Sequence, residues 1–194
     1  MSDTWLFVGG NKDLPTQYVQ ALRFAQRFTT ITTNRGIVWL RVPDYHFVTN
    51  QGGILPLWHE LALEALKRGT HVVTPSGRKA IGYADTFIDA SEGFPRRGGY
   101  GEIRISGPTC LEFACNNGAK RILLVGATGY PENHDPSYFD TDAIRHCQKA
   151  PGFNHMLSSQ ITLVCKAWDD VEFICFGVPT FTVDAANWRS YVEK

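Results

Sequence analysis

The fold is decided by the stretch RISGPTCLEFACNNGAKRILLVG, residues 104–126, which predicts a loop, a helix and a buried strand in succession. Ser106 suits the N-cap position, and Pro108 suits the first helical turn because a missing N–H costs nothing there. Gly118 supplies the left-handed residue with which helices often end. The apolar run Ile122 to Val125 is too short for a helix and fits a strand that is covered on both faces.

This order of elements also predicts the place of a site. In parallel sheets, ligands collect at the carboxyl ends of strands and at the N-termini of the following helices. Ser106-Gly107 and the segment from Gly126 to Tyr130 are therefore expected to face one crevice.

Length and composition favour one globular unit. The chain has 194 residues, of which 43% are hydrophobic, and this is enough for a single domain with a substantial core. Nineteen basic and nineteen acidic side chains give a formal charge of zero, so bulk electrostatics favours neither nucleic acid nor an anionic membrane. No targeting signal or membrane segment is visible at the N-terminus.

The five cysteines have no CxxC or zinc-like spacing. Most of them lie in apolar runs, as reduced core thiols do. This pattern predicts a cytoplasmic location. The cysteines in apolar runs are Cys110, Cys115, Cys165 and Cys175.

Three predicted strands in the first part of the chain end in asparagine. Trp5 to Val8 is followed by Gly9-Gly10-Asn11 and a helix from Pro15 to about Arg27; this turn is neither GxGxxG nor a P-loop. Thr29 to Thr33 ends at Asn34, and Tyr45 to Thr49 ends at Asn50, before a helix from about Leu55 to Arg68. An asparagine amide can bond a nucleobase edge or ribose hydroxyls, and it also tolerates left-handed turn geometry. A turn role is the simpler explanation for each one; their recurrence favours binding.

The next segments are less regular. A fourth strand is predicted at His71 to Thr74, followed by an irregular basic excursion over 76–101 that contains a short helix. Within it, Arg96-Arg97 can form a loop that closes on an anionic substrate, or it can simply be solvated. The segment 127–154 is long for a plain connection, which indicates either an active-site loop or disorder.

The last part of the chain predicts a helix over 156–168, a strand over 171–176 and a tail that closes with a short helix carrying Trp188. The fold class is therefore α/β: a single Rossmann-like domain over 1–194, with a mostly parallel sheet and helices on both faces. Trp58 and Trp188 are expected to be exposed, and they can serve a homo-oligomer interface. A metal site is not expected, because no specific ligand spacing joins the candidate residues. Those candidates are His134, Asp135, His146, Cys147 and His155.

Taken together, these motifs resemble the bacterial lipooligosaccharide sialyltransferases and the wider 6-hydroxymethylpterin pyrophosphokinase-like superfamily, which is common in bacterial and phage genomes. That family has a Ser-Gly before a small-residue helix, and then Gly-x-(Lys/Arg)-x-Ile-x-Leu-x-Gly. This chain has Ser106-Gly107, and then residues 118–126. The family's first strands also end in asparagines that contact the nucleotide.

The resemblance implies a glycosyltransferase-like enzyme that uses a CMP-sugar type of donor and needs no metal or other cofactor. Tyr130 and Tyr138 look like the two tyrosines that bond the leaving phosphate, and His155 sits where the family has its general base toward the acceptor hydroxyl. The positions implied for nucleotide binding are Gly10, Asn11, Asn34, Asn50, Ser106, Gly107 and Thr128. Arg96, Arg97 and Arg104 are candidates for positioning the substrate.

The chain also departs from the family. Lys12-Asp13-Leu14 replaces the Gly-Pro-Ser of the opening turn, and Thr128 stands where the family usually has an acidic residue. These departures favour a rival interpretation, a non-catalytic nucleotide-binding or nucleotide-sequestering protein. A third is pyrophosphate transfer to a pterin-like alcohol, which would require Mg²⁺ and carboxylates. The carboxylates available for it are Asp135, Asp140 and Asp142.

Overall fold

The structure is a computed structural model of the chain, and it describes residues 2–10, 13–25, 27–48, 56–75, 84–88, 106–129 and 150–193. Within these residues, one sheet is formed by β1 (Thr4–Val8), β2 (Thr29–Thr33), β3 (Tyr45–Phe47), β4 (His71–Pro75), β5 (Thr86–Ile88), β6 (Arg121–Val125), β7 (Glu172–Phe176) and β8 (Trp188–Tyr191). The described helices are α1 (Leu14–Ala21), α2 (Gly36–Trp39), α3 (Pro56–Lys67), α4 (Ser106–Asn116) and α6 (Ala150–Ala167).

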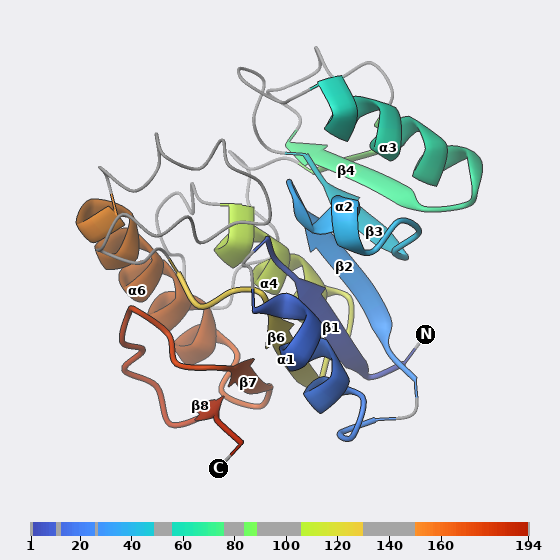
Figure 1. Cartoon of the computed structure of the whole chain (residues 1–194). Helices are drawn as coiled ribbons and strands as arrows, with labels where there is room; N and C mark the ends of the chain where they lie inside the picture. Colours follow the sequence, from blue (N-terminus) through green and yellow to red (C-terminus); the bar gives the residue numbers. More distant parts are fainter. Residues whose placement is uncertain are drawn as a thin grey trace.

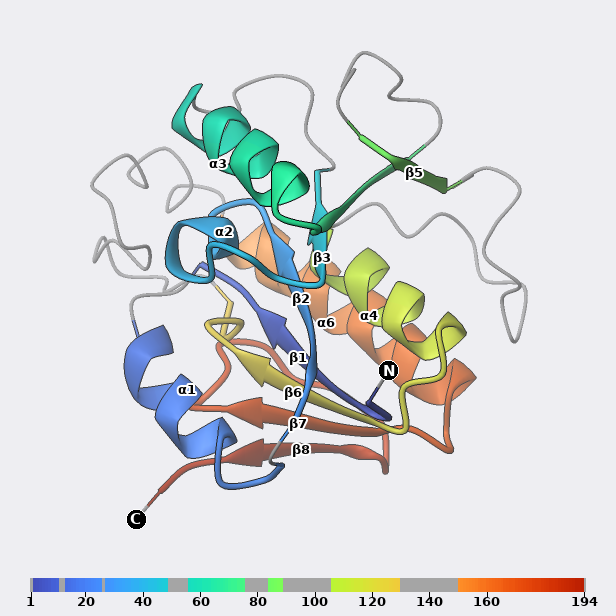
Figure 2. The same ribbon diagram turned by 90° about the vertical axis from the view of Figure 1, so that its right-hand side faces the viewer.

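The strand order is β5-β4-β3-β2-β1-β6-β7-β8, and every neighbouring pair is parallel. The chain first builds the sheet outward from β1 through β2 to β4 (Figure 1) and β5 (Figure 2), and then returns to the other side of β1 with β6. The order therefore reverses between β1 and β6. A reversal of this kind defines the place where open parallel sheets hold their ligands. The predicted Rossmann-like α/β class is confirmed.

The two faces of the sheet are covered by different helices, and β1 shows how the sequence achieves this. Trp5 and Phe7 point to the face covered by α4 and α6, whereas Leu6 and Val8 point to the face covered by α1. This alternation follows from the two-residue period of a strand. Figure 2 shows the resulting layers, with α4 and α6 on one side of the sheet and α1 on the other.

Helix α4 is the central element of the larger core. Eight consecutive residues, Pro108 to Cys115, are buried, whereas Ser106 and Gly107 at its N-terminus are half-buried. Gly118 ends the helix region with a φ of 87°, the left-handed conformation predicted for it. Because α4 leads directly into β6, its N-terminus must lie at the carboxyl edge of the sheet.

Four predictions of secondary structure were wrong. The first helix, α1, ends at Ala21 and not near Arg27. The excursion over 76–101 contains strand β5 in its described part, because Thr86 to Ile88 pair with β4. The tail forms strand β8 instead of a helix, since residues 188–191 pair with β7. Helix α6 begins at Ala150, so residues 150–154 are helical and His155 lies inside the helix. Pro151 suits the first turn of that helix.

The prediction that Trp188 is exposed was also wrong. Trp188 is partly buried, and its ring lies 6.1 Å from that of Phe181 at the margin of the larger core. The side chain of Trp58 lies outside the described set. The homo-oligomer interface remains an untested prediction.

The four described cysteines are free and buried, as predicted. Burial raises the pKa of the Cys110 and Cys115 thiols well above their usual range, and it raises the pKa of Cys165 and Cys175 to about 12. These thiols stay protonated and are not nucleophiles at neutral pH. None of the described helices is long and apolar enough to cross a membrane.

A buried polar pair joins β2 and β3 on the side of the sheet opposite to α4. Thr32 Oγ1 lies 2.8 Å from His46 Nδ1, and both side chains are almost completely buried. Burial lowers the pKa of His46 to about 3, so the imidazole is neutral in the folded protein.

We expect this pair to make stability fall in acid. In the unfolded chain the pKa of histidine is near 6.5, so His46 binds a proton below that pH. In the folded protein His46 stays neutral until the pH approaches 3. The contribution of His46 is complete above pH 6.5 and decreases as the pH falls toward 3, by about 1.4 kcal/mol per pH unit. Urea unfolding between pH 7 and pH 4 should show this slope reduced in His46→Asn and unchanged in His155→Asn. Equal slopes in all three proteins would contradict the assignment.

Candidate functional site

Glycines end three neighbouring strands at the carboxyl edge of the sheet. Gly9 follows β1, Gly126 follows β6 and Gly177 follows β7. Gly126 and Gly177 have φ values of 63° and 96°, which favour glycine over other residues. The chain therefore turns sharply at the point where the strand order reverses.

At this point the turns after β1 and β6 pack backbone against backbone. A Cβ atom on Gly9 would lie 2.2 Å from the carbonyl oxygen of Gly126, which no side chain can tolerate. A Cβ atom on Gly36, the first residue of α2, would lie 2.2 Å from the Val8 carbonyl oxygen. Because Gly9, Gly126 and Gly36 carry no side chain, the end of β1, the turn after β6 and the start of α2 can pack against one another.

Gln17 fixes the turn after β6 from the side of α1. Its side chain is buried, and its Oε1 accepts a hydrogen bond of 2.7 Å from the Gly126 amide. A Cβ atom on Gly177 would lie 2.6 Å from Gln17 Nε2, so the same side chain also fills the space beside β7. We did not predict this role. The signal was present, because Gln17 is a polar residue at helical spacing between the apolar Leu14 and Ala21.

Asn34 and Ser106 come together across the same edge, as predicted from their positions after a strand and before a helix. The Asn34 amide Nδ2 donates a long hydrogen bond of 3.5 Å to Ser106 Oγ. Asn34 is the only non-glycine residue with positive φ in the described chain, at 49°. This left-handed turn directs the chain from β2 into α2, so the turn role and the polar contact coexist.

The N-terminus of α4 favours an anion more than that of α1 does. The first turn of α4 carries no acidic residue, and its first N–H groups have no partner within the helix. Among the described residues, only the ring of Phe7 lies near the missing Cβ position of Gly107, at 3.9 Å. By contrast, the carboxyl group of Asp13 stands at the N-cap of α1, where it opposes a second negative charge.

The connection after β6 lies against the turn after β7. The Thr128 carbonyl oxygen accepts a hydrogen bond of 2.8 Å from the Thr180 amide, and the Thr128 residue is buried. A Cβ atom on Gly129 would lie 2.9 Å from Asn154 Oδ1, which brings the first turns of α6 to this edge. Thr128, predicted to bind nucleotide, therefore contacts the neighbouring turn.

His155 follows the buried Asn154 on α6. His155 is exposed, and it forms no hydrogen bond or ion pair with another described residue. Its helix thus places it near the carboxyl edge, and none of the described residues orients it as a partner commonly orients a general base. Gly10 is half-buried directly after Gly9.

Several predicted site residues lie outside the described residues. They are Asn11, Asn50, Arg96, Arg97, Arg104, Tyr130 and Tyr138. Four of the metal candidates, His134, Asp135, His146 and Cys147, lie outside them as well. The part of the chain that the structure describes contains no group of three or more side chains able to hold a metal ion.

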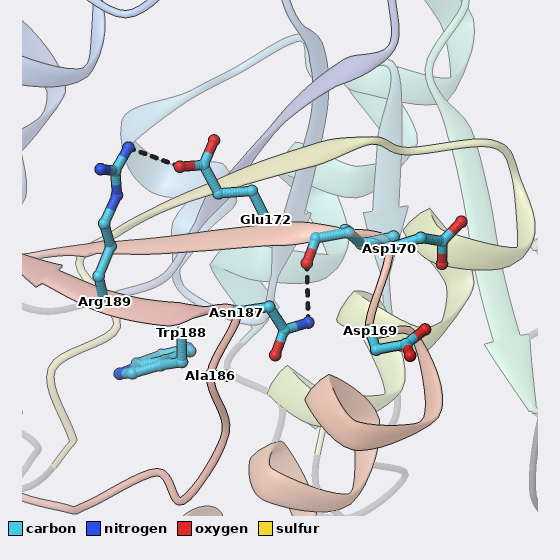
Figure 3. Close-up of a pocket in the computed structure, with 8 residues that line it drawn as sticks. Asp169, Asp170, Glu172, Ala186, Asn187, Trp188 and Arg189 are labelled. Atoms are coloured by element: carbon cyan, nitrogen blue, oxygen red, sulfur yellow. Dashed lines mark hydrogen bonds and ion pairs between the residues drawn. The ribbon is translucent and has the colours of Figure 1, made fainter.

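A cavity of about 370 Å³ lies at the opposite, amino-terminal edge of β7 and β8. Figure 3 shows Arg189 directed at Glu172, an ion pair of 2.6 Å, and the Asn187 amide directed at the backbone before β7. Asn187 Nδ2 also donates to the carbonyl oxygens of Cys165 and Trp168, so it holds the end of α6. Arg189, Glu172 and Asn187 thus serve the structure, and we do not assign the site to this cavity.

Comparisons with protein-family models, with curated proteins and with solved structures found no match to the chain.

Replacing Gly9 with alanine tests the backbone contact at the reversal point. Because the new methyl group meets a carbonyl oxygen of the backbone, Gly9→Ala should lower the free energy of unfolding by about 2 to 3 kcal/mol or more. Chemical denaturation measures the change.

Gly152→Ala is the matched control, because its Cβ would meet no atom of the described residues within 4 Å. It lies in a helix, where alanine is favoured over glycine by up to about 1 kcal/mol. Equal stability of the two variants would show that the turns after β1 and β6 can move apart freely.

Proposed function

We propose that the protein binds a nucleotide at the carboxyl edge of the sheet, between the end of β2 and the N-terminus of α4, and uses it as the donor in a group transfer. The observation that carries the proposal is the contact between Asn34 and Ser106 beside the reversal of strand order. It joins an amide that can bond a base or a ribose to a helix N-terminus that favours phosphate.

The electrostatics of α4 supports the phosphate part of this proposal. Most of the helix is buried, so water screens its dipole only weakly, while Ser106 and Gly107 remain accessible at its positive end. The Ser106 hydroxyl and the first backbone N–H groups are neutral donors. A site of this kind binds an anion without needing a basic side chain.

The transfer that we propose uses a donor of the CMP-sugar type. The acceptor hydroxyl oxygen forms a bond to the sugar carbon while the bond from that carbon to the phosphate oxygen breaks, and the nucleotide leaves with the electron pair. His155 takes the acceptor proton, and Tyr130 and Tyr138 donate hydrogen bonds to the departing phosphate. A neutral imidazole suits the base role near physiological pH. A cytoplasmic location is part of the proposal, since the buried free thiols suit a reducing compartment.

One observation favours a second candidate, nucleotide binding without transfer. His155 is exposed and makes no polar contact with another described residue, so nothing described orients it. In this alternative the Asn34–Ser106 edge holds the ligand, and the histidine is a surface residue of α6.

Asn34→Gly tests the binding site directly. Glycine adopts the left-handed backbone of Asn34 freely, so the variant removes the amide without adding strain. Nucleotide affinity should fall about tenfold or more, as expected for the loss of a good polar contact. The measurement is thermal shift followed by calorimetric titration with CMP, UDP, GDP and adenine nucleotides, with and without Mg²⁺.

Asn117→Gly is the control, because Asn117 lies beyond the opposite end of α4, where its amide bonds the Phe113 carbonyl oxygen. It should leave nucleotide affinity unchanged. If no nucleotide stabilises the wild-type protein, the proposed function fails. Stabilisation that appears only with Mg²⁺ would favour pyrophosphate transfer.

His155→Ala separates transfer from simple binding. If His155 is the base, the variant should lose transfer by about a hundred-fold or more while its nucleotide affinity stays nearly intact. Product formation from CMP-sugar donors, measured by chromatography, checks this. Equal loss of affinity and transfer would indicate a structural role, and a wild-type protein that binds CMP without transferring a sugar would favour the second candidate.

A further inference from the structure

Strand β8 forms one edge of the sheet and pairs with β7 alone among the described strands. Figure 2 shows β8 at the bottom of the sheet, with no described element beyond it. The Tyr191 carbonyl oxygen accepts a hydrogen bond of 2.9 Å from the Gly177 amide, so the backbone groups of Tyr191 face β7. Because these groups alternate along a strand, Ser190 directs its N–H and C=O away from β7. Ser190 is exposed, so this edge is open to a further strand.

The side chains at this edge do not protect it. Lysine and proline commonly prevent strand addition, and β8 contains neither. Its one charged side chain, Arg189, is directed at Glu172 in an ion pair of 2.6 Å (Figure 3). The charge is therefore balanced within the same sheet.

Two exposed valines lie at the carboxyl end of β8. Val178 is 71% exposed and Val192 is 54% exposed. They lie close together, because Val178 follows Gly177, Val192 follows Tyr191, and the backbones of Gly177 and Tyr191 are hydrogen-bonded. Apolar side chains beside open backbone groups suit a protein partner.

We propose that this edge pairs with β8 of a second copy of the chain, antiparallel and centred on Ser190, so that the two sheets join in a twofold-symmetric dimer. In this register Ser190 faces Ser190 of the second copy. Arg189 then faces Tyr191 of the second copy, and Trp188 faces Val192 of the second copy. Each of these two pairs occurs twice, once on either side of the axis.

The cross-strand pairs favour a second copy over an unrelated strand. Tyr191 packs on the α1 side of the sheet, and Arg189 has the same parity, so a guanidinium group meets an aromatic ring. Trp188 packs on the α6 side and shares its parity with Val192, so an aromatic side chain meets a β-branched one. An unrelated strand would gain the backbone hydrogen bonds but not these pairs.

The dimer leaves the proposed nucleotide site open. In the strand order, β7 and β6 separate β8 from the reversal between β1 and β6, and antiparallel pairing directs the carboxyl edges of the two copies in opposite directions. The inference therefore goes beyond the proposed function and does not depend on it.

Sedimentation equilibrium of the full chain tests the edge. The wild-type protein should dimerise between about 1 and 100 µM. Ser190→Pro removes an N–H that faces away from β7, so the variant should keep its midpoint of urea unfolding while its dimer affinity falls about tenfold or more. Figure 2 allows the reader to follow this edge.

A charge exchange tests the register. Ser190→Lys and Ser190→Glu each place like charges opposite one another at the axis, so each variant alone should dimerise about tenfold more weakly or not at all. An equimolar mixture of the two should restore the dimer, because lysine then faces glutamate. Thr16→Lys is the matched control, since Thr16 is exposed on α1, and it should dimerise like the wild-type protein.

The outcomes decide the inference. Loss of the dimer in both charge variants, with restoration on mixing, supports it. A wild-type protein that stays monomeric over the whole range overturns it, whether the edge remains open or binds another chain. A dimer that Ser190→Pro and Ser190→Lys leave unchanged lies at another surface and overturns it as well. Charge variants that mixing does not restore overturn the register centred on Ser190.

Discussion

The backbone contact between the turns after β1 and β6 is the constraint on which the rest of the structure depends. The Gly9 amide donates to the Val125 carbonyl oxygen at 2.8 Å, and the two glycines leave no room for a side chain between the turns. Gln17 holds the second turn through its hydrogen bond to Gly126. Because β1 and β6 lie side by side, the strand order reverses between them. The N-terminus of α4, the helix that leads into β6, therefore lies at the carboxyl edge of the sheet.

That edge assembles a binding site mostly from neutral groups. Asn34 arrives at the end of β2 in a left-handed turn, and Ser106 opens a helix that is buried along most of its length. Their chemistry favours a ligand with both hydrogen-bonding edges and a negative charge, which is the combination that a nucleotide offers. The cavity at the opposite edge differs in kind, since Arg189 pairs with Glu172 and the Asn187 amide bonds the backbone.

The sequence was sufficient to predict those elements that are specified by the residues within the segment itself. The run from Thr29 to Thr33 is rich in β-branched residues, and β2 has these bounds. Strands β5 and β8 were not predicted, because such short segments become strands only by pairing with β4 and β7. In the site, Asn34 and Ser106 were predicted from their places after a strand and before a helix. The role of Gln17 was not predicted, because it depends on which turns lie beside α1.

The central claim is that the ligand binds where the strand order reverses. Its most direct test is a titration of the ¹⁵N-labelled protein with the nucleotide that stabilises it best, followed by backbone amide chemical shifts. The account predicts the largest shift changes at Asn34, Ser106, Gly107 and Gly126, with little change at the opposite edge. Changes confined to residues 187–189, which line the cavity at the amino-terminal edge, would contradict it.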